Sequence, residues 1–308
     1  MAQPHICFIL HGRRSPSHWP DRLLRQFSRR FVVQIHITTS GLRAEEVACL
    51  AVTQGCDFVI AVGGDGTVHE VVNGVMRAPA ERRARVTLGV LPVGTGNDFA
   101  RSLGMSASVS RLYRLIQRDS ARWLDLGRID TLGEAPWTRY FANIASLGVS
   151  SAVVERVARM PRWLPAGPAY GLGAVLSLLT WRPSRMQVTF DEGTVIEEPM
   201  VDLCLANGRY FGGGLGVAPE ARQDDGLLDV VMIRNASVVA FLRFMPLMRQ
   251  TRRIDDARVR YAKSRGVRVS SDPPGCPLEA DGEQLGSAPV RVSVLPGALR
   301  WLGCESGR

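Results

Sequence analysis

The sequence predicts an α/β N-terminal nucleotide-binding type of domain with a parallel sheet, followed by an antiparallel, β-rich C-terminal domain. Three observations predict this fold class. The chain has 308 residues, which at roughly 100–200 residues per domain favours two domains. Before about residue 127, apolar strands alternate with helical patterns, which is typical of a parallel sheet covered on both faces. From about Arg128 the chain changes to short β-like segments joined by Gly, Pro and Asn turns.

Four apolar runs and the helical patterns between them predict the N-terminal domain. Strands are expected at Ile6–Leu10, Phe31–Ile37, Phe58–Val62 and Val86–Leu91, and helices at Asp21–Arg30, Ala44–Gln54, Val68–Met76 and from Phe99 onward. Except for Phe31–Ile37, which contains Gln34 and His36, the strands lack the polar alternation of a half-exposed sheet, so helices should cover both of its faces.

Shorter segments predict the C-terminal domain. Strands are expected at Tyr140–Ala145, Gln187–Phe190, Met200–Ala206, Leu227–Ile233, Val267–Ser270 and Val290–Leu295, and helices at Ser151–Arg159, Ala169–Leu179 and Val238–Met248. No low-complexity linker separates the two halves, so a short hinge near Gly127 should join a domain of residues 1–127 to one of residues 128–296.

The composition is that of a folded protein, because 45% of the residues are apolar and 22% are charged. Disorder and collagen-like repeats are therefore excluded. The cysteines form neither a CxxC pair nor a cluster at zinc spacing: Cys7, Cys49, Cys56, Cys204, Cys276 and Cys304. No secretory signal opens the sequence, and the apolar stretch Ala169–Trp181 is too short to span a bilayer. We expect a cytoplasmic protein with reduced thiols.

The formal net charge is +9, and all but one of the 38 basic residues are arginine. The exception, Lys263, lies in no GxxxxGK[ST] loop, which excludes the P-loop kinases. A basic surface attracts anions of any kind, including nucleotides, nucleic acids and acidic lipid headgroups. The sequence contains no recognised nucleic-acid-binding module, so we expect no nucleic-acid partner.

The first loop that carries chemistry is Gly63-Gly64-Asp65-Gly66-Thr67, which follows a predicted parallel strand. Ligands bind open α/β sheets at this end of the strands. The glycines let a triphosphate approach the backbone, and the helix that follows offers N–H groups to anions. Asp65 has the wrong charge for phosphate and is suited to orient magnesium or its waters. Thr67 and Glu70 also match a capping box, a structural role compatible with phosphate binding.

A second loop, Gly94-Thr95-Gly96-Asn97-Asp98, ends the next strand. Its glycines expose backbone N–H groups, Thr95 offers a hydroxyl, and Asn97 with Asp98 offers polar groups to a nucleotide or to the waters of a metal. The structural alternative is an Asx-type N-cap before the helix at Phe99. Two such loops on one sheet edge favour a shared ligand.

Five blocks of the sequence resemble the diacylglycerol/sphingosine kinase superfamily, and the bacterial lipid kinases in particular. They are GGDGTVHEVVNG, LPVGTGNDFA, WLDLG, ANGRYFGGGLGVAPEARQDDGLLDVVMI and LEADGE. The resemblance runs from about Ile6 to Leu302, although GGDGT alone also occurs in NAD kinases and phosphofructokinases. It implies a nucleotide-binding domain like that of NAD kinase and phosphofructokinase. It also implies that the C-terminal segment, residues 297–308, returns to this domain.

The resemblance implies ATP and Mg²⁺ as cofactors and assigns roles to individual positions. The positions that match the nucleotide site are Thr38, Gly64, Asp65, Gly66, Thr67, Val68, His69, Glu70 and Thr95, with Asn97 added from the second loop and Thr39 as the neighbour of Thr38. Asp65, Asp98 and Asp125 match the positions that hold catalytic magnesium through waters. Glu283 matches the general base, which a lipid hydroxyl needs because its own pKa is high.

A second cation site is implied within Arg222-Gln223-Asp224-Asp225-Gly226-Leu227. The Asp225 carboxylate and the carbonyls of Arg222 and Leu227 would hold a structural Mg²⁺, since hard cations take oxygen ligands. The alternative is a DG turn between two strands.

One loop departs from the family pattern. The loop after the first strand usually begins with Asn, and here it is His11-Gly12-Arg13-Arg14-Ser15. The two arginines are candidates for contacts with nucleotide phosphates, and contacts of this loop with the nucleotide stay open.

An apolar helical stripe beside dense positive charge is typical of docking on anionic membranes. The stripe consists of Val238, Phe241, Leu242, Met245 and Met248, and eight arginines and one lysine lie between Arg243 and Arg268. The alternative is a core helix followed by solvated charges, and Pro246 should shorten or kink the helix. Gly171–Leu179 is a candidate lining for an acyl pocket or plain core.

The resemblance therefore implies an ATP- and Mg²⁺-dependent lipid kinase that phosphorylates the hydroxyl of a lipid such as diacylglycerol. The alternatives are a kinase of the NAD kinase type and a silent regulator that binds nucleotide or membrane. The sequence identifies neither the acceptor lipid nor the oligomeric state, for which a homodimer is one option.

Overall fold

The computed structural model describes residues 3–12, 15–133, 135–161, 164 and 166–303. The chain divides into two units. Unit 1 is formed by Met1–Leu124 with Gly297–Arg308, and unit 2 is formed by Asp125–Pro296. Both crossings between the units lie inside strands, the first in β5 (Ala121–Thr131) and the second in β17 (Val290–Leu302).

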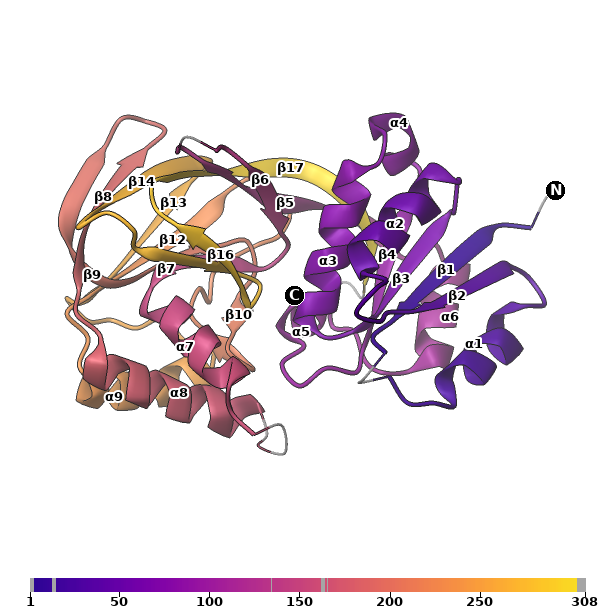
Figure 1. The fold of residues 1–308 in the computed structure, drawn as a ribbon, viewed down its shortest axis with the longest axis horizontal. Coiled ribbons are helices and arrows are strands. Elements are labelled where there is room, and N and C mark those ends of the chain that lie inside the picture. The colour runs from indigo at the N-terminus through magenta and orange to yellow at the C-terminus, as the bar shows by residue number, and fades with distance from the viewer. Residues whose placement is uncertain (1–2, 13–14, 134, 162–163, 165, 304–308) are drawn as a thin grey trace. The chain divides into compact units, whose positions relative to one another are not determined.

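Unit 1 contains a parallel sheet in the strand order β2-β1-β3-β4-β17 (Figure 1). The first four strands are β1 (His5–Leu10), β2 (Val32–Ile37), β3 (Phe58–Gly63) and β4 (Thr87–Pro92). The end of β17 adds a fifth strand, in which Trp301 pairs with Leu88. The expected apolar runs thus form the sheet, and a segment about two hundred residues away in sequence completes it.

Helices cover both faces of this sheet, as the uninterrupted apolar strands predict (Figure 1). They are α1 (Trp19–Phe27), α2 (Ala44–Thr53), α3 (Asp65–Arg77), α4 (Ala80–Arg83), α5 (Asp98–Ser102) and α6 (Val109–Gln117). Edge-to-face aromatic contacts hold the layers together. The ring centroids of Phe8 and Phe27 are 5.0 Å apart, and those of Phe99 and Trp301 are 4.7 Å apart.

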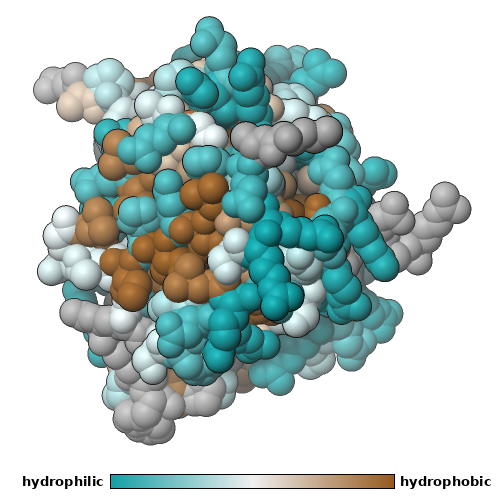
Figure 2. Space-filling view, turned by 90° about the vertical axis from the view of Figure 1, so that its right-hand side faces the viewer, coloured by the Kyte–Doolittle hydropathy of each residue, from teal (hydrophilic) through white to brown (hydrophobic). Residues whose placement is uncertain are grey.

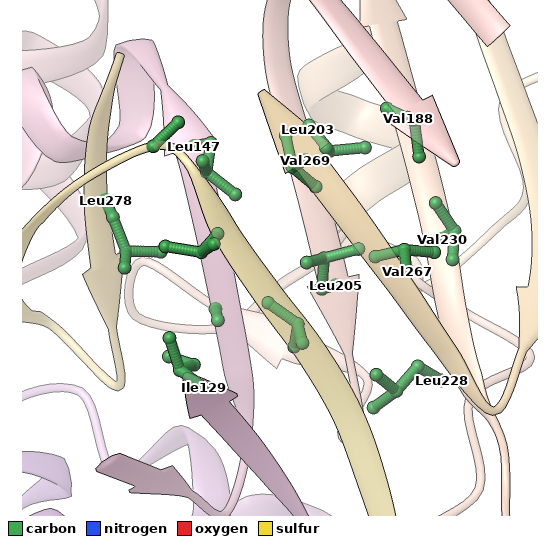
Figure 3. Packing of buried hydrophobic residues seen from close by; sticks show 14 of the residues in the cluster. Ile129, Leu147, Val188, Leu203, Leu205, Leu228, Val230, Val267, Val269 and Leu278 are labelled. Atoms are coloured by element: carbon green, nitrogen blue, oxygen red, sulfur yellow. The ribbon is translucent and has the colours of Figure 1, made fainter. Parts of the chain in front are cut away.

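Unit 2 is dominated by antiparallel strands, which confirms the predicted fold class. Its strands after β5 are β6 (Thr138–Phe141), β7 (Ile144–Gly148), β8 (Ser184–Phe190), β9 (Val195–Ala206), β10 (Tyr210–Phe211), β11 (Leu215–Gly216), β12 (Leu228–Arg234), β13 (Val259–Ser264), β14 (Gly266–Asp272), β15 (Pro277–Ala280) and β16 (Glu283–Ser287). Figure 3 shows the core between them, where side chains such as Leu147, Leu203, Val230 and Val267 point toward one another. Alternate residues of the same strands face the opposite side.

Three helices belong to unit 2: α7 (Val149–Ala158), α8 (Ala166–Thr180) and α9 (Val238–Arg249). Helix α9 inserts Ala240, Phe244 and Met248 into a second apolar cluster that includes Cys204 and Val231. The predicted docking stripe is therefore wrong for Met248, which is core, whereas Leu242 on the same helix is exposed. Pro246 was expected to shorten or kink this helix. It does not shorten it, because the helix continues beyond it to Arg249.

Helix α3 begins at Asp65, three residues before the predicted start at Val68. The expected capping box is wrong as well, because the N-cap is Gly64 and no side chain caps it. The Glu70 carboxylate is used elsewhere: its Oε2 accepts a hydrogen bond of 2.9 Å from the Ala44 N–H at the start of α2. Glu70 therefore caps the neighbouring helix instead of its own.

Strand β2 is the free edge of the parallel sheet in unit 1. Figure 2 shows an apolar patch among hydrophilic side chains on this side of the molecule, and Val32, Ile37 and Leu50 are exposed large apolar residues of β2 and α2. The homodimer that the sequence leaves open stays a prediction. In the described part of the chain, no helix is long and apolar enough to cross a bilayer.

The packing of α2 on α3 yields a first prediction. A Cβ added at Gly74 would lie 2.1 Å from the carbonyl oxygen of Glu45 and 2.9 Å from the Cβ of Ala48. We expect Gly74→Ala to lower the free energy of unfolding by about 1–3 kcal/mol, as overpacking does, in urea denaturation followed by circular dichroism. The matched control is Gly171→Ala on α8, where nothing lies within 4 Å of the added carbon. That variant should be neutral or stabilising by up to about 1 kcal/mol, and equal effects of the two would contradict the close approach.

Candidate active site

The two glycine-rich loops of unit 1 touch each other at the carboxyl ends of β3 and β4. A Cβ at Gly94 would lie 2.4 Å from the Cα of Gly64, so only glycine lets the loops approach this closely. The register of the strands produces this contact, because Gly63 pairs with Pro92 at the ends of the two parallel strands. The sheet edge therefore brings together the two motifs that the sequence singled out.

The carboxylates of Asp65 and Asp98 lie around Gly96. A Cβ at Gly96 would be 2.8 Å from Oδ2 of Asp65 and 3.7 Å from Oδ2 of Asp98. Both carboxylates also make bonds within the protein: Asp65 Oδ1 accepts a hydrogen bond of 3.0 Å from the Phe99 N–H, and Asp98 Oδ1 pairs with Arg101 at 2.8 Å. Two carboxylate oxygens thus face one small region, the donor type that Mg²⁺ prefers.

Asn97 holds the second loop in shape. Its Oδ1 accepts a hydrogen bond of 3.0 Å from the Gly94 N–H, and its Nδ2 donates one of 2.7 Å to the Gly94 carbonyl. Asn97 adopts a left-handed backbone conformation, with φ at 56°. The structural alternative, an Asx-type N-cap, is not formed, because the Asn97 side chain makes no capping bond to α5. Asp65 takes that role from the first loop.

At the first turn of α3, a ligand would contact the backbone more than the side chains. Thr67, Val68 and His69 are all buried, so a ligand at this end of the helix would meet main-chain N–H groups. Thr95 is exposed on the second loop, and Thr38 lies after β2, where its Oγ1 accepts a hydrogen bond of 3.2 Å from the Gly12 N–H. In the loop after β1, Arg13 and Arg14 lie outside the described residues.

In unit 2, Asp125 anchors the loop that the sequence proposes as a cation site. It is only 3% exposed, and its Oδ2 accepts a hydrogen bond of 2.8 Å from the Gly226 N–H. Its own N–H donates to the Gln223 carbonyl at 2.7 Å, and its carbonyl accepts from Asn207 Nδ2 at 2.9 Å. Asp125 therefore fixes this loop against the start of the β-rich unit.

The Asp225 carboxylate is paired with the single lysine of the chain. Its Oδ2 lies 3.2 Å from Lys263 Nζ, which also lies 3.1 Å from Asp229 Oδ2, and its Oδ1 accepts from the Leu227 N–H at 3.1 Å. The pKa of Lys263 is raised by these two carboxylates against the opposing effect of burial, so the ammonium stays charged. A cation held by Asp225 and the carbonyls of Arg222 and Leu227 would have to displace this ammonium. The donor set fits a structural Mg²⁺ less well than the sequence implies.

Glu283 begins β16 and is exposed. The turn before it is fixed by Asp281, whose carboxylate accepts three successive backbone N–H groups, those of Ala142, Asn143 and Ile144, at 2.9, 3.0 and 3.2 Å. The Asp281 N–H in turn donates to the Ile144 carbonyl at 2.9 Å. The backbone turn before Glu283 is therefore fixed by hydrogen bonds, as a positioned base requires.

Besides Asp229, two buried carboxyl groups of unit 2 were not singled out by the sequence analysis. Asp202 on β9 and Glu279 on β15 are 3% and 4% exposed. Burial raises the pKa of Asp202 to about 6 and that of Glu279 to about 8. No local signal marks Glu279, because Leu278-Glu279-Ala280 alternates in the way that a strand with one face in water does.

Catalytic magnesium fits the residues of unit 1, where Asp65 and Asp98 turn oxygens toward Gly96. Among the described residues, no cluster of three or more His, Cys, Asp or Glu side chains could hold a metal alone. That the carboxylates of the site hold magnesium through waters stays a prediction; Mg²⁺ usually keeps several waters and also binds substrate phosphates. Asp125 and Glu283 belong to unit 2. Asp125 is bonded to Gly226, and the turn before Glu283 is held by Asp281.

Comparisons with known proteins cover both units. Residues 5–129 match the family profile described as the diacylglycerol kinase catalytic domain, and residues 143–303 match the one described as the YegS C-terminal NAD kinase beta sandwich-like domain. A probable lipid kinase YegS-like from Chromohalobacter salexigens is 32% identical over 273 residues, covering 86% of this chain and 82% of that protein. A diacylglycerol kinase from Mycobacterium tuberculosis is 33% identical over 269 residues, with coverage of 86% and 82%.

Solved structures show the same fold. The crystal structure of a diacylglycerol kinase from Bacillus anthracis matches 97% of this chain and 97% of its own, with a TM-score of 0.70 and 20% identity. The two profiles, the extent of the identity and the five sequence blocks agree with one another. The chain belongs to the family of the diacylglycerol kinase catalytic domain, which includes the YegS-like lipid kinases.

Proposed function

We propose that the protein is an ATP- and Mg²⁺-dependent lipid kinase that transfers the γ-phosphate of ATP to the hydroxyl of a lipid such as diacylglycerol. The observation that carries the proposal is the pair of touching loops in unit 1, which turns the carboxylates of Asp65 and Asp98 toward Gly96 at the carboxyl edge of the parallel sheet. Family membership supports the reaction class. The identity of the acceptor rests on the names of relatives, two of which are called diacylglycerol kinase.

In this proposal unit 1 holds the nucleotide. The N–H groups at the start of α3 and the Thr95 hydroxyl bind the triphosphate, and Thr38 lies at the nucleotide. The positions from Gly64 to Glu70 contribute to this site mainly through their backbone. Glu70 also caps α2. Mg²⁺, when bound, neutralises charge that develops on the phosphate oxygens, and Asp65, Asp98 and Asp125 would orient it through waters.

In this proposal unit 2 binds the lipid and supplies the general base. Glu283 accepts the proton of the lipid hydroxyl as its oxygen attacks the γ-phosphorus in line with the leaving ADP. Its exposed position leaves the carboxylate accessible, and the Asp281 turn fixes the backbone from which it projects. The structural Mg²⁺ at Arg222, Asp225 and Leu227 stays part of the proposal, in competition with Lys263.

We further propose that this cytoplasmic enzyme contacts anionic membranes through α8 and α9. Exposed apolar side chains follow one another at helical spacing on α8, at Leu172, Leu176 and Leu179. Val239 and Leu242 are exposed on α9, which packs beside α8, and Arg243 and Arg249 of α9 are exposed too. Apolar side chains flanked by arginines match a headgroup layer of negative charge over acyl chains.

The proposed reaction is tested by incubating the purified protein with γ-labelled ATP, Mg²⁺ and a panel of lipids in mixed micelles, with NAD in a parallel reaction. Label in one lipid supports the proposal and identifies the acceptor. Label in NADP alone overturns the lipid assignment in favour of a kinase of the NAD kinase type. Binding of ATP without any transfer favours a silent regulator.

Replacing the base should separate binding from chemistry. We expect Glu283→Gln to lower kcat by about 10²–10⁴-fold, because the amide cannot accept the hydroxyl proton. The Kd for ATP, measured by calorimetry, should stay within about twofold. Glu192→Gln, which removes an exposed carboxylate from the turn between β8 and β9, is the matched control and should keep full activity. Full activity of Glu283→Gln would remove Glu283 from its role.

The structural cation can be tested through stability. We expect Lys263→Met to gain a Mg²⁺-dependent rise in Tm of at least about 2 °C, because removing the ammonium leaves Asp225 and Asp229 unneutralised. Thermal unfolding in Mg²⁺ and in chelator measures the effect, without nucleotide. Lys263→Arg keeps the charge and should behave as the wild type does. If Mg²⁺ shifts the Tm of the Met variant and the wild type equally, the ammonium does not compete for the site.

Membrane contact can be tested by sedimentation with vesicles. Replacing both Val239 and Leu242 by Gln should weaken binding to vesicles that contain phosphatidylglycerol by about tenfold, because two exposed apolar contacts are lost. Binding of the wild type should also fall as salt rises. Leu24→Gln, at an exposed apolar position on α1, is the control. Unchanged binding of the double variant would exclude this surface.

A further inference from the structure

Glu279 lies in the middle of a polar cluster between the sheet of unit 2 and helix α7. Its neighbours in the chain, Leu278 and Ala280, point into the apolar core, so the alternation of the strand directs Glu279 to the opposite face. There it pairs in register with Ser146 on β7, which pairs in turn with Cys204 on β9. Helix α7 packs against β15 on this side.

Both oxygens of Glu279 are bonded, and the two partners lie on different segments. The Ser146 hydroxyl is 2.5 Å from Oε1, and the Gly282 N–H donates to Oε2 at 3.0 Å. Glu279 therefore ties β7 to the turn that precedes Glu283. Asp281 holds the same turn from the other side through its three backbone bonds.

The surroundings of Glu279 favour its neutral form. The titratable groups that face it are Asp202 and Cys204 on β9 and Asp281 in the turn. Burial is the main cause that raises the pKa of Glu279 to about 8, and the charges of Asp202 and Asp281 act in the same direction. The bonds from Ser146 and Gly282 oppose the rise only in part.

Among the described residues, the remaining elements packed around Glu279 place their charged side chains at exposed or half-exposed positions. Helix α7 presents Ser150 and Ser151, and its charged residues, Glu155, Arg156 and Arg159, lie at exposed or half-exposed positions. Asp202 is itself held by the N–H and the hydroxyl of Ser150 and by the Cys204 thiol. On β16, Gln284 pairs opposite Glu279, and Glu283 is exposed.

We propose that Glu279, in its neutral form, is a positioning residue for the turn that carries Glu283, and that its ionisation sets the alkaline limit of phosphoryl transfer. The inference rests on the proposed function. A neutral carboxyl can donate to the Ser146 oxygen while it accepts from Gly282, whereas a charged one accepts from the Ser146 hydroxyl in a stronger, charge-assisted bond. Loss of the proton adds a third negative charge to those of Asp202 and Asp281, and the resulting repulsion loosens the turn.

The test compares the pH profiles of kcat/KM for the wild type and Glu279→Gln between pH 6.5 and 9.5. Because a single group with a pKa of about 8 ionises, the wild type should lose about tenfold between pH 7 and pH 9. The glutamine variant has nearly the same shape and cannot ionise, so it should stay within about threefold of the wild type at pH 7 and keep its activity at pH 9. The same alkaline loss in both proteins would overturn the inference.

A second variant separates positioning from folding. Ser146→Ala removes one bond that favours the charged form of Glu279, so the midpoint of the alkaline loss should move upward from about 8. The KM for ATP should not change in either variant, because the proposed nucleotide site is built by unit 1. A midpoint that does not move would contradict the role of Ser146 and with it the inference.

Two readouts do not depend on activity. An infrared difference spectrum between pH 7 and pH 9 should show the loss of a protonated carboxyl band in the wild type that is absent from Glu279→Gln. Since the pKa of Glu279 in the folded protein lies above the ordinary value of 4.5, the stability contributed by neutral Glu279 should be lost as the pH rises from about 4.5 through about 8. A wild type without kinase activity that shows the band would refute the proposed function and leave the neutral carboxyl established. An active wild type without the band would refute the inference alone.

Discussion

Carboxylates that accept backbone N–H groups from segments far away in sequence hold both units of this protein in their working shape. Asp65 accepts from Phe99 and joins the two loops of unit 1, while Glu70 accepts from Ala44 and joins two helices. In unit 2, Asp125 accepts from Gly226, and Asp281 accepts from three successive residues starting at Ala142. A buried carboxylate is stable only when it is bonded in this way, and each bond in turn fixes a loop that no regular sheet or helix would hold. The acidic residues of the motifs therefore determine the geometry of the loops as well as their charge.

The acidic residues thus serve both as charged groups of the site and as hydrogen-bond acceptors for distant loops. This explains which parts of the site could be predicted from the sequence. The strands β1, β3 and β4 were predictable because a strand covered on both faces is apolar throughout. The capping box at Thr67 and Glu70 was predicted wrongly, because a local pattern does not reveal that another helix start, at Ala44, competes for the same carboxylate. Glu70 bonds to the distant Ala44 instead of to its own helix start. A single sequence does not display such tertiary contacts.

Glu279 shows the same limit in the β-rich unit. An acidic residue at alternate positions of a strand normally faces water, and here helix α7 covers that face. The shift of its pKa follows from the cover, which periodicity in the strand alone does not show. Asp225 gives a complementary case. Its sequence context predicts a cation site, and the fold places the single lysine of the chain against the same carboxylate from a strand nearly forty residues later. Local motifs give the chemistry that a segment can perform, whereas the neighbours it meets decide which part of that chemistry remains free.

Strand β17 affects how the protein can be made. Its last residues, including the fully buried Trp301 and Leu302, form the strand beside β4 in the sheet of unit 1. A ribosome delivers the N-terminal strands first, yet the sheet to which they belong lacks one strand until synthesis has reached Trp301. The nascent α/β unit must wait with the apolar surface of β4 and α5 uncovered while the β-rich unit is translated. The whole of unit 2 is thus synthesised before the residue that covers Phe99, Trp301, is added to the chain.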